Sequence, residues 1–394
     1  MRVVELAIGL RCGETRLSVK RRGRRGLYVR RRGAEATLSG NIVSSAHSSS
    51  PLWLVTNEPH VNELVSYLET MRRRIEASPD ETHVFEFSRS RLADVRTAFA
   101  RMIRHGEEQL HRVCELLCET FLDSTYTLQS VVIGEVETTK ERFTLVKSIS
   151  PGDLYSQTDL DLGTRQLRRR RYHDGRLWSP ASLVANVVEY QPAGMNEWGI
   201  HKFISRIKAE EQIWNKVVDS IFGFDTLVNA DKQLRHLGGF VKDVFGVKAV
   251  VGDPEAVRAL HDALLKLEWP SAVLAKHDVP LLDRTSRLEF IEVKDYMADV
   301  GRKETGWEAI KSVFRWWDST IEVQVQPLWN YHQEREYLTR ESHAGFKERR
   351  ETLRNQVAGA IPLFGFYRDL LRWLFLSPDE PAPTFEAVEI VLRD

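Results

Sequence analysis

Basic, acidic and aromatic side chains recur between residues 206 and 347 in an order that suggests a reaction as well as a fold. Near the start of this stretch, Arg206 is followed by Lys208, Gln212 and Lys216, spaced at i, i+4 and i+8. In a helix, that spacing places the two lysines and the glutamine on one stripe. The sequence therefore predicts a helix with a polar, cationic stripe.

Two acidic residues of this stretch are expected at strands. Asp243 leads into the β-branched run Val244–Val251, which predicts a buried strand. Glu322, Gln324 and Gln326 alternate with valines, which indicates a second strand with one polar face. We therefore expect Glu322 on the polar face of its strand.

A loop and a charged helix flank the second strand. The loop ahead of it has the sequence Lys303-Glu304-Thr305-Gly306-Trp307. The helix-like region after it carries His332, Glu336, His343 and Lys347.

In this order the chain resembles the RelA/SpoT family of nucleotide pyrophosphokinases, the alarmone synthetases, including their small, toxin-like branch. That family carries R-x-K-x-x-x-S-I-x-x-K, an acidic residue before G-I-R, then K-x-N-G-Y, E-x-Q-I-R and a histidine-rich helix. The resemblance covers about residues 200–350. It implies an α+β fold, in which a mixed β-sheet is flanked by helices.

The resemblance also implies an activity and a site. Family members transfer the pyrophosphate of ATP to the ribose 3′-hydroxyl of GDP or GTP, giving a guanosine tetra- or pentaphosphate alarmone and AMP. ATP binding then falls to Arg206, Lys208, Lys216 and Lys248, and catalysis and Mg²⁺ binding fall to Asp243 and Glu322. Acceptor binding falls to Lys303, Gly306, Trp307, Gln324 and His332. Trp307 stands where the family has a tyrosine that stacks on the acceptor base, and an indole offers a larger face.

Five positions depart from the family pattern. Gln212 replaces a serine, Lys248 an arginine, Thr305 an asparagine, Lys311 a histidine and Gln326 an arginine. The lost cation at position 326 is compatible with another acceptor, with compensation from elsewhere, or with an inactive descendant. Two alternatives therefore stay open. One is a toxin-like synthetase that pyrophosphorylates the 3′ CCA end of tRNA and stops translation, for which a neutralising partner is a possible partner. The other is an inactive nucleotide-sensing or RNA-binding protein.

The same residues also have ordinary structural explanations. Lys208 and Lys216 suit the solvated face of an amphipathic helix, and Asp243 suits the cap of a turn. Trp307 suits a hydrophobic core, and His332 suits a structural role.

The rest of the chain is predicted to form further units. Residues 1–178 are expected to form a separate α+β module, 179–199 a linker, 200–350 the synthetase-like domain and 351–394 a helical tail. Periodicity predicts helices over Val61–Ile75, Leu92–Phe121 and Pro254–Leu267, the last capped by Asp253, and paired strands over Tyr126–Ile133 and Arg142–Ile149.

Composition bounds the cellular setting. The 394 residues are 42 % hydrophobic and 28 % charged with a formal net charge of zero, which favours a globular protein without bulk attraction to nucleic acid. An odd set of three cysteines and an N-terminus without a signal peptide's apolar core indicate a cytoplasmic protein. Cys114 and Cys118 lie in an apolar helical pattern, which favours buried thiols over a metal site. The apolar stretch 357–376 is interrupted by charges, so no membrane partner is expected.

Local charge points to a different partner. Basic runs at 20–32 and 168–171 suit contact with RNA phosphates, although a solvated charged surface has the same composition.

Overall fold

The computed structural model describes most of the chain from residue 51 onwards. The described residues are 51–52, 58–122, 125–136, 138–139, 141–156, 163, 165–167, 171–173, 178–224, 241–297, 307–340 and 342–394, without the side chains of 182, 335–340 and 342–349. The basic run 20–32, most of 168–171, Lys303 and Gly306 fall outside these ranges, so the predictions about them stay predictions. All described residues belong to one compact unit, Val43–Asp394.

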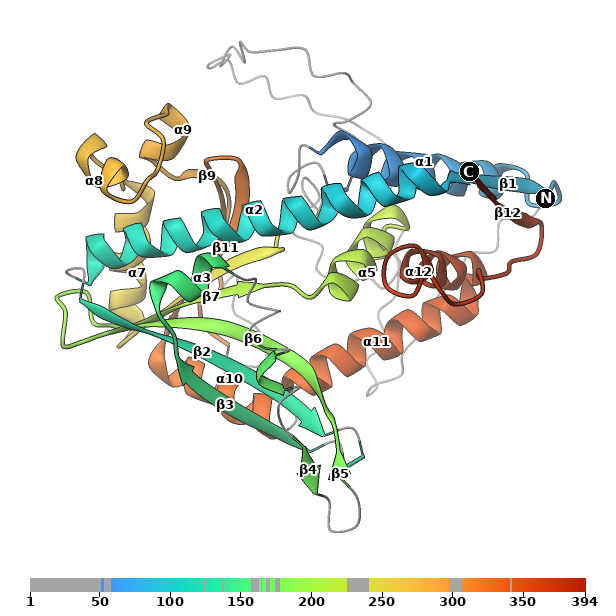
Figure 1. Ribbon diagram of the computed structural model, residues 1–394. Coiled ribbons are helices and arrows are strands. Elements are labelled where there is room, and N and C mark those ends of the chain that lie inside the picture. Colours follow the sequence, from blue (N-terminus) through green and yellow to red (C-terminus); the bar gives the residue numbers. More distant parts are fainter. Residues whose placement is uncertain are drawn as a thin grey trace, which may run out of the picture. The chain divides into compact units, whose positions relative to one another are not determined.

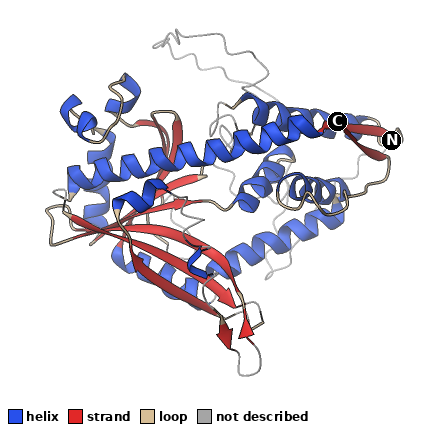
Figure 2. Cartoon of the chain, in the orientation of Figure 1, coloured by secondary structure: helices blue, strands red, loops and turns tan. Residues whose placement is uncertain are grey.

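An eight-stranded mixed sheet has the strand order β3-β2-β6-β7-β8-β11-β10-β9 (Figures 1 and 2). Its strands are β2 (Tyr126–Val136), β3 (Arg142–Ser148), β6 (Ala181–Pro192), β7 (Ile200–Ile207), β8 (Phe245–Val251), β9 (Glu289–Asp295), β10 (Ile310–Trp316) and β11 (Ser319–Pro327). β8 and β11 run parallel, and the other neighbouring pairs are antiparallel. Two smaller sheets pair β4 (Tyr172–His173) with β5 (Trp178–Ser179), and β1 (His83–Ser88) with β12 (Val388–Arg393).

Helices flank the sheet, as the resemblance implied. They are α1 (Pro59–Ala77), α2 (Arg89–Phe121), α3 (Pro151–Ser156), α5 (Glu210–Ile221), α7 (Pro254–Leu265), α8 (Ser271–Lys276), α9 (Asp283–Ser286), α10 (Leu328–Arg340), α11 (Ser342–Ala360) and α12 (Pro362–Phe375). No helix in the described part of the chain has the length and apolar character needed to cross a bilayer.

The long helix α2 packs on the apolar face of the sheet (Figure 1). It begins at Ser88, whose side chain accepts a hydrogen bond from the backbone N–H of Arg91 at 3.3 Å, a normal N-cap. At Gly106 a Cβ would lie 2.1 Å from the ring of Phe245, so glycine allows helix and strand to approach closely. Cys114 and Cys118 are buried in this helix, as the apolar pattern predicted.

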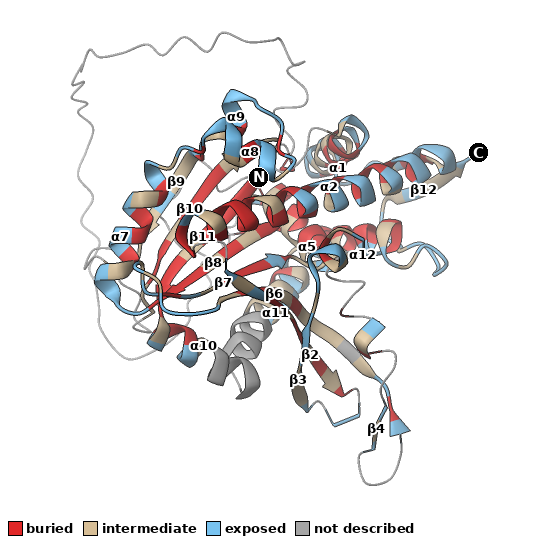
Figure 3. Cartoon of the chain, turned by 60° about the vertical axis from the view of Figure 1, so that its left-hand side comes forward, coloured by how far each residue is buried: buried red, intermediate tan, exposed pale blue. Residues whose placement is uncertain are grey.

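Helix α7 covers the same face beside α2. Asp253 caps it by accepting from the backbone N–H of Ala256 at 2.8 Å, which confirms the predicted cap. Figure 3 shows that β8, β10 and β11 are buried along most of their lengths. These central strands therefore form a firm base for side chains on the other face.

The arrangement differs from the expected division into module, linker and domain. β2 and β3, predicted within a separate N-terminal module, pair into the same sheet as β7 to β11. The expected linker contains β6, whose twelve residues pair with β2 and β7. A separate module over 1–178 is therefore not seen among the described residues. The sequence pattern did predict the β2–β3 hairpin, but strand pairing between distant segments leaves no local signal.

The first helix of the candidate site is also shorter than expected. Residues 200–207 form β7 and α5 begins only at Glu210, so Lys208 lies between a strand and a helix. The prediction that Lys208, Gln212 and Lys216 form one stripe on a helix was therefore wrong. Pairing of β7 with both β6 and β8 outweighs the helical spacing of these polar residues.

The predicted tail packs into the body of this unit. Leu363, Phe364 and Leu370 of α12 are buried in the main core, together with apolar residues of α1 and α5. The chain then ends in β12, which pairs in parallel with β1. The segment 351–394 is thus part of the fold and includes a strand.

Candidate functional site

One face of the sheet carries a row of polar side chains. Residues paired directly across neighbouring strands share a face. Gln324 of β11 pairs with Lys248 of β8 on one side and Lys311 of β10 on the other, and Lys311 pairs with Lys294 of β9. The alternate residues, such as Val323, are buried in the core on the face covered by α2 and α7. The predicted polar face of β11 is thus present and continues onto β8, β10 and β9.

Asp243 lies immediately before β8 and binds two lysines. Lys208 donates to Asp243 Oδ2 at 2.9 Å, and Lys216 of α5 donates to the same oxygen. The backbone N–H of Lys208 donates to the carbonyl of Val244 at 2.9 Å, which holds the end of β7 beside the start of β8. The structure therefore brings together three of the predicted residues from three different segments.

Glu322 lies in the polar row and is paired with Lys311. The Lys311 ammonium lies 2.6 Å from Glu322 Oε2, and Gln324 donates to Glu322 Oε1 at 3.2 Å. Glu322 is 4 % exposed and Asp243 is 9 % exposed, so both carboxylates are taken out of bulk water. Lys311, which sequence comparison marked only as a departure from the family, is a member of the site.

The electrostatics tie these groups into one cluster. Burial opposes ionisation of Asp243, but Lys208, Lys216 and Lys311 outweigh it and hold the pKa of Asp243 well below its usual range. Burial lowers the pKa of Lys311, but Glu322 and Asp243 outweigh it, so this pKa is raised. Because Lys311 interacts with both carboxylates, it links the Asp243 and Glu322 pairs.

Lys208 behaves differently from Lys311. Burial lowers the pKa of its ammonium, Asp243 opposes that effect, and the nearby cations Lys216 and Arg206 add to the lowering. The net direction is downward. An anion arriving beside Lys208 would offset both the burial and the repulsion.

A second cluster surrounds Glu334 of α10. Lys248 donates to Glu334 Oε2, Gln326 donates to the same oxygen at 3.1 Å, and the indole N–H of Trp307 donates to Oε1 at 2.6 Å. Burial raises the pKa of Glu334, but Lys248 and the other donors outweigh it, so the pKa is lowered. Trp307 also makes an edge contact with Tyr296.

The remaining predicted residues fall at different places. Arg206 is exposed on the polar face opposite Gly246, and no ion pair of its side chain is found among the described residues. His332 is exposed on α10, whereas its neighbours Tyr331 and Glu334 face the sheet. The structure therefore does not bring His332 into either cluster. Glu334 takes part instead. The sequence contained no indication of this, because Glu334 lies far from Lys248 along the chain.

The carboxylates of the first cluster offer oxygen atoms of the kind that Mg²⁺ binds. Asp243 Oδ1 is buried without a hydrogen-bond partner among the described residues, although Oδ2 of the same carboxylate has two. Within those residues no three His, Cys, Asp or Glu side chains form a metal-binding group. Mg²⁺ commonly takes one or two carboxylates and completes its shell with phosphate oxygens and water. Asp243 and Glu322 therefore fit an ion that arrives together with a phosphate substrate.

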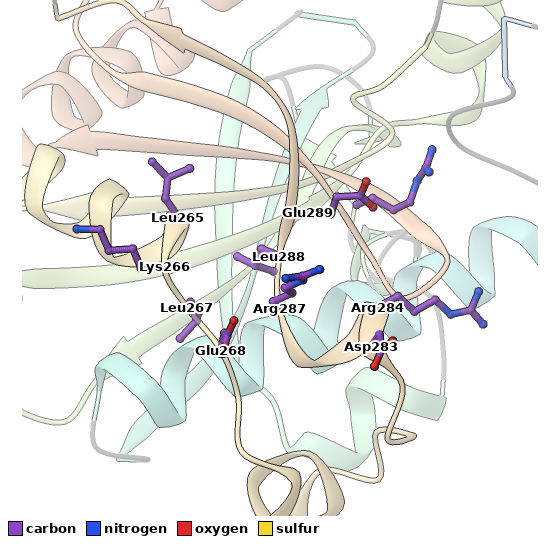
Figure 4. Close-up of a pocket in the computed structure, with 10 residues that line it drawn as sticks. Leu265, Lys266, Leu267, Glu268, Asp283, Arg284, Arg287, Leu288 and Glu289 are labelled. Atoms are coloured by element: carbon purple, nitrogen blue, oxygen red, sulfur yellow. The ribbon is translucent and has the colours of Figure 1, made fainter. Parts of the chain in front are cut away.

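A separate cavity of about 520 Å³ lies near the end of α7, between α9 and the start of β9 (Figure 4). Arg284 is paired with Asp318 at 2.7 Å. The charged residues of the lining are both basic and acidic: Lys266, Arg284, Arg287, Arg315, Glu268, Asp283 and Glu289. No predicted site residue lines it.

Comparison with known proteins gives a partial likeness. No protein-family model matches the chain, and no curated protein matches it. A structure of small alarmone synthetase 1 from Bacillus subtilis bound to its product pppGpp is 13 % identical over 44 % of this chain and 81 % of that one, with a TM-score of 0.22. A second structure of small alarmone synthetase 1 is 12 % identical over 41 % of this chain and 82 % of that one, also with a TM-score of 0.22. Both are alarmone synthetases. With a TM-score of 0.22, these matches assign no function to the present chain.

Proposed function

We propose that this chain is an ATP-dependent pyrophosphokinase that transfers the pyrophosphate of ATP to the ribose 3′-hydroxyl of GDP or GTP, giving AMP and a guanosine tetra- or pentaphosphate. The observation that carries the proposal is the cluster of Asp243 and Glu322 with Lys208, Lys216 and Lys311 on one sheet face. Burying such a cluster costs solvation and contributes little net stability. Perturbed, interleaved charges of this kind are typical of functional sites.

The cations of this cluster, with Arg206, would bind the triphosphate of ATP. Lys216 is about one third exposed at 32 %, and Arg206 is exposed without an ion pair in the described part of the chain. A phosphate entering here would replace carboxylate contacts of the lysines with phosphate contacts. The guanidinium of Arg206 would bind two phosphate oxygens at once, and the lysines would act as point charges.

The transfer itself needs few groups. The 3′-oxygen of the acceptor attacks the β-phosphorus of ATP, and the bond between that phosphorus and the oxygen bridging to the α-phosphate breaks. The bridging oxygen leaves with AMP, and the proton of the hydroxyl passes to Glu322. Lys311, 2.6 Å from Glu322, would orient this carboxylate. Positioning and charge stabilisation then account for most of the acceleration.

Asp243 and Glu322 would hold Mg²⁺, which would neutralise charge on the ATP phosphates. The side chains of Arg206, Lys208 and Lys216 would bind and orient the same phosphates from the protein side.

The test uses the purified full chain with Mg²⁺ and ATP labelled at its β-phosphate. GDP, GTP and deacylated tRNA are offered in parallel, and ATP labelled at its α-phosphate is the matched control. We expect β-label on the guanosine nucleotide and α-label only on AMP. No transfer to any acceptor, with ATP binding intact, would contradict the proposal and leave a nucleotide-sensing or RNA-binding protein.

One observation favours a second acceptor, the 3′ CCA end of tRNA. Glu334 neutralises Lys248, and Gln326 brings no charge where the family has arginine. The region beside Trp307 is therefore short of available cations among the described residues, which suits an acceptor end with few phosphates better than GDP or GTP. In the same assay, label on tRNA that is lost on charge reversal of 168–171 would support this function, with a neutralising partner to be sought.

A further inference from the structure

Helix α5 lies between the Asp243 cluster and the C-terminal helices. Its Lys216 binds Asp243, while Trp214 stacks on Phe375, which ends α12, with ring centroids 3.8 Å apart. Unlike Lys208, whose backbone is held to the sheet, Lys216 depends on the position of its helix. The contacts that fix the position of α5 therefore also fix the position of Lys216.

Asp219 of α5 is held by two arginines of α11. Arg354 donates from Nε to Asp219 Oδ1 at 3.0 Å and from Nη2 to Oδ2 at 2.7 Å, and Arg350 donates to Oδ2 at 3.0 Å. The Asp219 and Arg354 side chains are only 6 % and 11 % exposed. Burial lowers the pKa of Arg354, but Asp219 outweighs it, so this pKa is raised. The paired hydrogen bonds fix both distance and direction.

A second contact ties α5 to the same region. Arg368 of α12 donates to the Asn215 side chain at 3.3 Å, and it also donates to Asn355 at 3.1 Å and to Glu351 on α11. Asn215 and Asp219 are four residues apart, so they lie on one side of α5. Both α11 and α12 therefore hold the same side of the helix, next to Lys216.

We infer that Asp219 and Arg354, assisted by Arg350, are positioning residues that hold Lys216 at Asp243. The catalytic consequence rests on the proposed function, but the placement of Lys216 does not. Lys216 and Asp219 are neighbours at i and i+3, so a shift of the helix at Asp219 moves the ammonium with it. The segment after residue 341 thus completes the phosphate-binding site although it touches no predicted substrate contact.

The first test measures the placement directly. Arg354→Lys keeps a cation beside Asp219 but loses the paired donors. The full-length variant is treated with an amine-acylating reagent, and labelling of individual lysines is followed by mass spectrometry. We expect Lys216 to be labelled about twofold faster or more, because its ion pair with Asp243 is loosened. Lys202, paired with Glu189 at 2.6 Å, is the internal reference and keeps its rate.

The control variant is Arg393→Lys, which alters the exposed Arg393–Glu86 pair at 2.6 Å between β12 and β1. It leaves Lys216 labelling as in the parent protein. Unchanged Lys216 labelling in Arg354→Lys, or equal acceleration at Lys202, would overturn the inference. If Arg354→Lys does not fold, Arg350→Gln, which removes a single bond to Asp219, gives the same comparison with a smaller effect.

The second test links placement to substrate binding. Arg354→Lys is expected to weaken affinity for a non-hydrolysable ATP analogue about fivefold, since a small displacement of a positioned group is costly. In a Lys216→Ala background the same change has little further effect, because the lysine that it positions is gone. Equal weakening in both backgrounds would overturn the inference. If the parent protein binds no ATP analogue, the proposed function fails, while the labelling experiment still decides the placement.

Discussion

At the scale of single residues, two buried carboxylates form the centre of the proposed site. Asp243 and Glu322 are both buried, and lysines that come from distant parts of the sequence bind them. The two carboxylates differ in surroundings, since Asp243 binds two ammoniums through one oxygen and Glu322 binds Lys311 and Gln324. In the proposed reaction both carboxylates would hold Mg²⁺, and Glu322 would also accept the proton of the acceptor hydroxyl.

Glu322→Gln is the decisive residue substitution. We expect the rate of pyrophosphate transfer to fall by about 10²-fold or more, because an amide neither accepts the proton nor binds the cation. The β-labelled ATP assay measures the rate, and circular dichroism checks the fold. Glu189→Gln is the matched control, because Glu189 is also a buried carboxylate bound to a lysine on this sheet. Equal losses in both variants would show a structural effect alone.

At the scale of elements, the close packing of α2 against β8 fixes the position of the strand that follows Asp243. Gly106 has no room for a Cβ against Phe245, whereas a Cβ at Gly359 in α11 meets nothing within 4 Å. Gly106 lies in the middle of α2 and Gly359 in the last turn of α11, and alanine is intrinsically preferred to glycine in a helix. The two positions therefore separate packing from helix propensity.

Gly106→Ala is expected to destabilise the protein by about 1–2 kcal/mol, since overpacking a core outweighs the gain in helix propensity. Gly359→Ala is expected to stabilise it by about 0.5–1 kcal/mol, because only the propensity term remains. Urea unfolding of both variants measures these changes. A stabilising Gly106→Ala would mean that Phe245 can move away without cost.

At the scale of the whole molecule, several buried carboxylates depend on cations from other strands and helices. Lys202 and Tyr331 bind Glu189, and together with Gln191 they outweigh its burial and lower its pKa, as Lys248 does for Glu334. A pKa that is lower in the folded state contributes stability above the unfolded value of about 4.3. That stability is lost as the pH falls from there through the folded values.

The urea midpoint is therefore expected to change little between pH 6 and about pH 5 and to fall as the pH drops below about 4.3. Glu189→Gln should have a lower midpoint at pH 6 and a shallower decline with acid, because one linked carboxylate is gone. Parallel pH profiles of the two proteins would contradict this account of Glu189.

Sequence alone determined the elements with a strong local period. The alternation from Glu322 to Gln326, the capped helix after Asp253, the hairpin of β2 and β3, and the helices α1 and α2 were all predicted from nearby residues. Local periodicity reports which face of an element is buried, and this information survives without knowledge of partners. The position of Asp243 before a strand followed in the same way.

Only the tertiary structure decided which elements meet. It made 200–207 a strand, joined β2, β3 and β6 to the central sheet, and brought Lys208, Lys216 and Lys311 together around two carboxylates. It also turned Glu334, and not His332, toward the sheet, and it placed Arg354 against Asp219. Strand order and ion pairs between distant residues depend on the packing of the whole unit, so no window of sequence contains them.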